Sequence, residues 1–324
     1  MRLDPFTSVL IAVVALASFF PCEGQVAVWF GLLTKLAVAL LFFMHGAKLS
    51  RQNLLAGLGH WRLHLVVMLS TFVLFPLLGL LLTPLVPHWL SPAIYLGFLY
   101  LCALPATVQS AIAFTSMAGG NVSAAVCSAS ASSILGIFLT PLLVGVLLEA
   151  RGAETDSLGA VGQIVVQLLL PFLAGHLLRP RLGAWVERHG RTLRLVDQGS
   201  ILLVVYTAFS AAVVEGLWHT VPVEALLLLG VICCLLLALV LGSTAWLGRR
   251  LGFSLEDRIV IVFCGSKKSL ATGAPMAQVL FAGAAVGPAL LPLMVFHQIQ
   301  LMVCAVLAQR YARRAEPLAA QSAR

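Results

Sequence analysis

Long apolar stretches follow one another along the whole chain, and they constrain its fold more than any other feature. A helix needs about 20 mostly apolar residues to cross the hydrocarbon core of a bilayer, which is about 30 Å thick. Ten stretches approach or exceed this length, at residues 7–21, 26–47, 62–86, 92–117, 121–148, 160–178, 196–215, 222–248, 258–282 and 286–311. The pattern predicts an all-α polytopic membrane protein with ten transmembrane helices.

The overall composition excludes a soluble globular protein. Hydrophobic residues make up 60% of the 324 residues and charged residues only 10%, whereas soluble domains contain about 25% charged residues. The seven cysteines lack the spacing of a zinc site or a disulfide framework, so no cofactor is expected. The first stretch is short, but Asp4 precedes it and no small-residue cleavage site ends it. We therefore expect a retained helix rather than a signal peptide.

The basic residues predict how the chain is oriented in the membrane. If the N-terminus is cytoplasmic, 16 of the 20 Lys and Arg residues lie in inside segments and one, Arg151, lies in an outside loop. This asymmetry follows the positive-inside rule and predicts cytoplasmic termini in a multi-pass protein of the plasma membrane. It also explains the net charge of +8 without a nucleic-acid partner, because the charge lies in short loops between apolar spans.

The ten spans divide into two halves of five, at residues 1–148 and 160–311. An acidic external linker at 149–159 joins the halves, and residues 312–324 form a cytoplasmic tail. An odd number of spans inverts the second half relative to the first, which is the arrangement of many secondary transporters. The spacing therefore favours two inverted five-helix repeats.

The fourth span of each half contains residues that interrupt a helix. In the first half, Pro105 removes a backbone donor and is followed by polar residues. In the second half, Gly265, Gly273 and Pro275 weaken the corresponding span, the ninth of the chain. Paired interrupted spans indicate a transporter binding site, although small and hydroxyl residues also serve helix packing alone. We predict that both helices are broken near these residues.

Two adjacent lysines, Lys267 and Lys268, lie near the middle of the ninth span. A charge at the bilayer centre costs about 2.5–3.5 kcal/mol on insertion scales, so it is placed against a cavity or a partner. All twelve acidic residues are expected in loops, in tails or at the ends of spans, so this central site should attract an anion. The predicted substrate-binding residues are Lys267, Lys268, Gln109, Ser110, Ser266 and Thr107.

Other polar residues of the spans allow more than one interpretation. Lys35, in the second span, is either a site residue or part of a polar crevice. Ser128 and Ser132 share a helix face, where small residues allow close packing and hydroxyl oxygens can bind a hard cation. The motifs of serine hydrolases and zinc proteases are missing from the sequence, so no enzymatic activity is expected.

At these residues the chain resembles the bile acid/sodium symporter (BASS) superfamily, and more closely its branch with the motif Gly-Ser-Lys-Lys-Ser-Leu-Ala. The matching segments are Leu104–Ser110, Gly120–Val122, Thr140–Pro141, Leu170–Pro180 and Cys264–Gly273. The resemblance implies a panel domain formed by the first, second, sixth and seventh helices, and a core domain formed by the other six. It also implies that the fourth and ninth helices are unwound where they cross. The transported solute would be an organic anion, either bile-acid-like or a small carboxylate.

The resemblance further implies a coupling ion. The sodium ligands carried over residue by residue are Gln109, Ser110, Ser128, Ser132 and Ser266. The family's glutamate in the ninth helix aligns near Val262 and is absent, with Lys267 close by. Three functions stay open: a sodium-coupled symporter of an organic anion, a proton-linked or uncoupled carrier in which an ammonium replaces the cation, and a non-transporting membrane regulator of calcium homeostasis.

Overall fold

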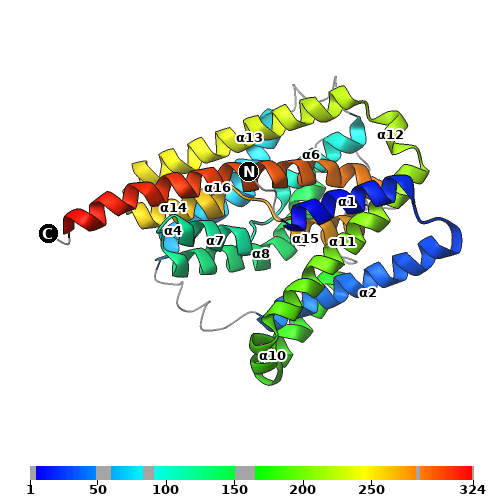
Figure 1. Cartoon of the computed structure of the whole chain (residues 1–324), viewed down its shortest axis with the longest axis horizontal. Coiled ribbons are helices and arrows are strands. Elements are labelled where there is room, and N and C mark those ends of the chain that lie inside the picture. Colours follow the sequence, from blue (N-terminus) through cyan, green and yellow to red (C-terminus); the bar gives the residue numbers. More distant parts are fainter. Residues whose placement is uncertain (1–4, 49–59, 83–90, 150–164, 282–284, 323–324) are drawn as a thin grey trace.

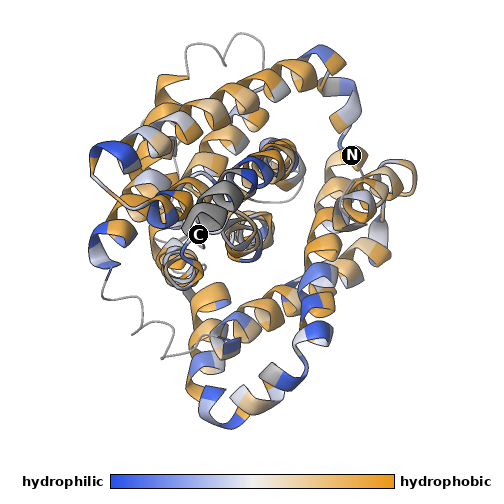
Figure 2. Ribbon diagram, turned by 60° about the vertical axis from the view of Figure 1, so that its left-hand side comes forward, coloured by the Kyte–Doolittle hydropathy of each residue, from blue (hydrophilic) through white to orange (hydrophobic). Residues whose placement is uncertain are grey.

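The computed structural model of the chain describes residues 5–48, 60–82, 91–149, 165–281 and 285–322. Within these residues all regular secondary structure is helical, in the arrangement shown in Figure 1. Figure 2 shows hydrophobic residues along most of the length of the helices and hydrophilic residues mainly toward their ends. The predicted all-α class is confirmed.

Six helices of the described part are long and apolar enough to cross a membrane. They are Gly24–Lys48, Trp61–Leu81, Val122–Leu147, Gly190–Val214, Val223–Arg250 and Val286–Arg313. Large apolar side chains on these helices face outward, with Leu36, Val146 and Leu227 each more than 60% exposed. An outward apolar surface of this kind is stable only against lipid. The chain is therefore a polytopic membrane protein.

The described part of the first half forms eight helical elements. They are α1 (Pro5–Phe19), α2 (Gly24–Lys48), α4 (Trp61–Leu69), η2 (Ser70–Leu74), α5 (Phe75–Leu81), α6 (Pro92–Ala103), α7 (Gln109–Met117) and α8 (Val122–Glu149). The elements α4, η2 and α5 follow one another directly, and η2 is a turn of π-helix. At its end the Phe75 N–H donates to the Ser70 carbonyl, five residues back. The fourth predicted span is divided between α6 and α7.

The described part of the second half also forms eight elements. They are η4 (Val165–Leu169), α10 (Leu170–Arg188), α11 (Gly190–Val214), α12 (Leu217–Thr220), α13 (Val223–Arg250), α14 (Leu255–Gly265), α15 (Leu270–Leu280) and α16 (Val286–Ser322). The ninth predicted span is divided between α14 and α15. Helix α16 continues to Ser322, so the predicted tail is helical up to that residue. Most of the predicted linker lies outside the described residues.

The helices form two groups. Helices α1, α2, α10 and α11 pack mainly against one another, and we call them the panel group. The elements α4 to α8 and α13 to α16 pack against one another and form the core group. In Figure 1, α2 and α10 lie side by side along the lower edge, whereas α13 and α16 run across the upper part.

Helix α11 connects the two groups. It packs against α1 and α2 within the panel group and against α15 and α16 of the core group. Gly287, on α16, lies so close to Ala208 and Ala212 of α11 that an added Cβ would meet the Ala212 side chain at 2.5 Å. The Gln278 amide on α15 also donates to the Thr207 hydroxyl of α11, at 3.5 Å. Small and polar side chains therefore make this connection, which is typical of helix contacts inside a membrane.

Two glycines make the close contact between α2 and α10. A Cβ added at Gly46 would overlap the backbone carbonyl of Phe172, and one added at Gly175 would overlap that of Phe43. Backbone atoms cannot move aside as the end of a side chain can. The two helices therefore depend on these glycines to approach each other.

We predict that Gly46→Ala destabilises the protein by about 1–3 kcal/mol, because the new methyl group forces α2 away from α10. Gly31→Ala, on the same helix, is the matched control, since nothing lies within 4 Å of the added Cβ. Thermal unfolding of the detergent-purified variants measures both effects. Equal unfolding temperatures for the two variants would show that the glycine contact is not needed.

Candidate functional site

Two interrupted helices meet in the core group, and we call their contact the crossing. It consists of residues 104–108, between α6 and α7, and residues 266–269, between α14 and α15. The Ser269 N–H donates to the Pro105 carbonyl at 3.0 Å and joins the two interruptions directly. Next to them, the Tyr100 hydroxyl of α6 donates to the Gly273 carbonyl of α15 at 2.5 Å.

Pro105 explains where α6 ends. It has no N–H to continue the helical hydrogen bonds, and the extended backbone of Leu104 follows from its ring. Neighbouring side chains then bond the released backbone groups: the Ala106 N–H donates to the Ser132 hydroxyl at 3.0 Å, and the Thr140 hydroxyl donates to the Ala103 carbonyl at 2.9 Å. The interruption is thus stable in an apolar interior because helix α8 supplies partners.

The prediction that Gly273 and Pro275 interrupt the ninth span is wrong, because both residues lie inside α15. That helix begins at Leu270, with the Ser269 hydroxyl accepting a hydrogen bond from the Thr272 N–H. Gly273 instead allows close packing, since an added Cβ would meet Leu104 and Leu293 side chains at 2.6 Å. Gly265, by contrast, is the last residue of α14.

Lys268 is fully buried, and its ammonium group makes three hydrogen bonds to backbone carbonyls. The acceptors are Thr71 at 2.8 Å, Cys102 at 2.9 Å and Leu104 at 2.6 Å. The ring of Phe75 lies 4.1 Å from the nitrogen, in the range of a cation–π contact. Because an ammonium has three N–H donors, this set uses all of them. Lys268 therefore ties η2 and the end of α6 to the second interruption.

The backbone of Lys268 is held by Gln300 of α16. The Gln300 side-chain carbonyl accepts from the Lys268 N–H at 2.9 Å, and its amide donates to the Lys268 carbonyl at 2.8 Å. The Gln300 amide also lies 2.9 Å from Nδ1 of His297. Sequence reasoning did not select Gln300, His297 or Tyr100. Their only sequence signal is a polar or hydroxyl group inside an apolar span.

Lys267 is also fully buried, but its surroundings differ. Its ammonium donates one hydrogen bond, to the Ser110 carbonyl at 3.1 Å. It lies 3.8 Å from the ring centre of Phe114 and 5.6 Å from that of Phe263. Among the described residues, neither Lys267 nor Lys268 forms an ion pair with an acid. Within the part of the chain that the structure describes, the crossing therefore holds two adjacent ammonium groups that form no ion pair with a carboxylate.

The first turn of α7 lies over the Lys267 ammonium. Val108 precedes this helix without a side-chain hydrogen bond to its free amides. Gln109 is exposed and Ser110 is half-buried, while the Thr107 and Ser110 hydroxyls lie 2.7 Å apart. The positive end of a helix favours an anion, and the charge of Lys267 adds to it. This arrangement brings together four predicted substrate residues, with Gln109 accessible at the surface.

The predicted sodium ligands of the fifth and ninth spans bond to other protein groups. Ser128 lies 2.7 Å from Nδ1 of His64. Ser132 accepts the Ala106 N–H described above, and the Ser266 hydroxyl donates to the Val262 carbonyl at 2.6 Å. Ser266 belongs to the crossing, and Ser132 bonds to it from α8. Each of these three hydroxyls thus has a protein partner, and the sodium site stays a prediction.

The acid Asp197, which the apolar pattern puts at the start of the seventh span, is buried. It lies about two turns inside α11, where it forms an ion pair with Lys48 of α2. Helix α11 begins already at Gly190, directly after α10, so Asp197 lies farther from its end than the apolar pattern indicates. This pair joins two panel helices. Lys35 is exposed on α2.

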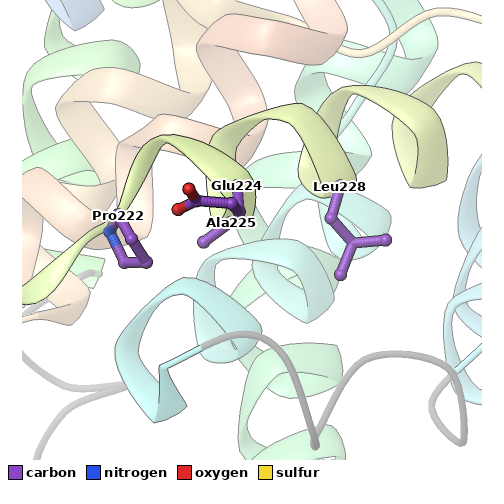
Figure 3. A pocket seen from close by; sticks show the side chains of 4 residues that line it. All are labelled: Pro222, Glu224, Ala225 and Leu228. Carbon is purple, nitrogen blue, oxygen red and sulfur yellow. The ribbon is translucent and has the colours of Figure 1, made fainter.

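A surface recess lies at the beginning of α13, outside the crossing. Pro222, Glu224, Ala225 and Leu228 line it, as Figure 3 shows. None of them is a predicted site residue, and the Glu224 carboxylate disfavours an anion there. The recess is therefore not the predicted substrate site.

The sequence was compared with known proteins. The model of the SBF-like CPA transporter family matches residues 4–313. "Uncharacterized protein PA2026" of Pseudomonas aeruginosa is 67% identical over 98% of this chain and 95% of its own length. "Putative symporter YfeH" of Escherichia coli is 63% identical over 98% and 96%. "Sodium/bile acid cotransporter 7" of Rattus norvegicus is 29% identical over 84% and 81%. The family match includes both interrupted helices.

We predict that Gln300→Leu lowers the free energy of unfolding by about 1–3 kcal/mol for each Lys268 backbone group that loses its partner. The Lys268 N–H and carbonyl are both bonded to this side chain, so the total effect should be among the largest of single substitutions. Met302→Leu, at an exposed position of the same helix, is the control. Thermal unfolding in detergent measures the difference. A loss no greater than that of the control would show that Gln300 does not hold the crossing.

Proposed function

Because the chain belongs to the SBF-like CPA transporter family, which is of the bile acid/sodium symporter type, we propose that it carries an organic anion across the plasma membrane by alternating access. Membership in this family makes it a transporter rather than an enzyme. One observation carries the anion proposal: Lys267 and Lys268 are buried side by side at the crossing of two interrupted helices, without an acidic partner among the described residues. A buried excess of positive charge favours a negatively charged solute.

The proposed substrate site is the first turn of α7. An anionic group of the solute would accept hydrogen bonds from the free amides of this turn and from the Gln109 side chain. The Thr107 and Ser110 hydroxyls lie beside it, and the Lys267 ammonium lies beneath it, bonded to the Ser110 carbonyl. Helix dipole and ammonium charge act in the same direction. The site therefore suits a carboxylate of a bile-acid-like molecule or of a small organic acid.

The proposed transport motion is a displacement of the panel group relative to the core group. The crossing lies entirely in the core group, so it would keep its geometry while the panel group moves. In the orientation predicted from the basic residues, with cytoplasmic termini and two inverted five-helix repeats, the contact of α11 with Gln278 and Gly287 lies toward the outside. Contact at that end supports a conformation that is closed to the outside and accessible from the cytoplasm.

Uptake by proteoliposomes tests the proposed function. Wild-type protein should take up at least one member of a panel of radiolabelled anions, with taurocholate representing bile acids and mono- and dicarboxylates representing small organic acids. Absence of uptake and of ligand-dependent thermal stabilisation for every anion would contradict the proposal and favour a non-transporting regulator.

We predict that Lys267→Gln lowers anion uptake about 10- to 100-fold, because the attraction between a buried ammonium and an anion about 6–12 Å away is worth about 1.4–2.8 kcal/mol at an effective dielectric constant of about 20. Arg249→Gln removes the same charge at an exposed position at the end of α13 and should leave uptake unchanged. Gel filtration and thermal unfolding establish that both variants are folded. Unchanged uptake by a folded Lys267→Gln variant would exclude Lys267 from the substrate site.

A further inference from the structure

Three carbonyl oxygens from two separate parts of the chain converge on the Lys268 ammonium. Thr71 belongs to η2, whereas Cys102 and Leu104 belong to the end of α6 and its interruption. The lysine itself comes from a third part, between α14 and α15. We call the three oxygens together with the Phe75 ring the carbonyl cage. The residues that form the cage are thus distinct from the residue that fills it.

The backbone forms the cage for reasons that do not involve Lys268. In a π-helical turn a carbonyl accepts from the N–H five residues later, and for Thr71 that residue is Pro76, which has no N–H. The Cys102 carbonyl would accept from the Ala106 N–H in a continuous helix, but that group donates to Ser132 instead. Pro76 and the interruption at Pro105 therefore leave the Thr71 and Cys102 oxygens, two of the three in the cage, without helical partners.

The chemistry of the cage suits a small monovalent cation. Its oxygens are neutral carbonyls, and rings of backbone carbonyls replace the water shell of monovalent cations in selective channels. The face of the Phe75 ring also attracts a positive charge, and this attraction does not depend on which cation carries it. Divalent cations are held mainly by carboxylates, and within the described residues the ammonium in the cage has no carboxylate partner. An anion would be repelled by the carbonyl oxygens.

We infer that the carbonyl cage is a monovalent-cation site that the protein fills with its own Lys268 ammonium. The wild-type chain then has a permanent, covalently attached cation at this point of the crossing. It neither needs nor admits sodium there. Removal of the lysine side chain converts the cage into a site that binds a free monovalent cation. The inference has one consequence for transport: anion uptake by the wild type should be independent of sodium. Only this consequence rests on the proposed function.

Thermal unfolding of Lys268→Ala in different salts tests the cage without a transport assay. The substitution removes three methylene groups and the ammonium, so propylammonium matches the lost atoms and ammonium, sodium and potassium match its charge. N-methyl-D-glucamine at equal ionic strength is the reference cation, since it is much larger than the lysine atoms that the substitution removes. The variant should be less stable than the wild type in the reference salt. Its unfolding temperature should rise with the concentration of at least one small cation, because only the folded state binds it.

Three control proteins show whether the cation effect depends on an empty cage. Wild-type protein should show no cation-specific change in unfolding temperature, since its cage is filled. Lys268→Met keeps an apolar side chain of similar length in the cage and should be destabilised without recovery in any salt. Lys267→Ala removes the neighbouring ammonium, which meets only one carbonyl, and should likewise show no cation-specific recovery.

Two outcomes would overturn the inference. One is a folded Lys268→Ala variant whose stability is the same in all salts, and the other is sodium-specific stabilisation of the wild type equal to that of the variant. The Lys268→Ala variant can also be purified in each salt. A folded protein obtained only in salts of small cations supports the cage, and no folded protein in any of these salts overturns it. Failure of wild-type anion uptake would contradict the proposed function and leave these stability results unaffected.

Discussion

The hydrogen bonds of one buried ammonium group hold the two interrupted helices together at the crossing. Lys268 donates to three carbonyls from η2 and from the end of α6, and its own backbone is bonded to Gln300 of α16. In an apolar interior an unpaired carbonyl costs several kcal/mol, so two interrupted helices could not meet there without such a donor. A cation is also favourable at the negative end of α6. The same residue therefore satisfies the hydrogen bonds and opposes the helix dipole.

Lys267 has a different environment from Lys268, and we therefore propose different roles for the two lysines. Lys267 makes one hydrogen bond and lies against two aromatic rings. Its charge is not offset by an acid among the described residues, and it lies under the first turn of α7. A structural cation and an attracting cation can thus stand next to each other in sequence, because successive residues of an interrupted helix point in different directions.

The remaining contacts hold the core group and the panel group together internally and connect the two groups more weakly. Hydrogen bonds from α8 and α16 fix the crossing within the core group. The panel group is held by the glycine contact of α2 with α10 and by the Lys48–Asp197 ion pair. Contact between the groups through α11 uses small side chains and long hydrogen bonds, which are weaker than the bonds inside either group.

Local sequence determined the class of the protein, the approximate positions of its helices and the interruption at Pro105, because apolar length and proline chemistry act over a few residues. It also placed two lysines inside a span and so predicted an anion site. Tertiary structure decided which groups these lysines contact. Lys268 and Thr71 are 197 positions apart, and Lys267 and Ser110 are 157 apart, distances over which hydropathy carries no information. For the same reason the sequence marked the start of the second interruption at Gly265 but extended it wrongly to Gly273 and Pro275, and it missed Gln300. A hydrogen bond depends on where two distant segments meet, and only the folded chain fixes that.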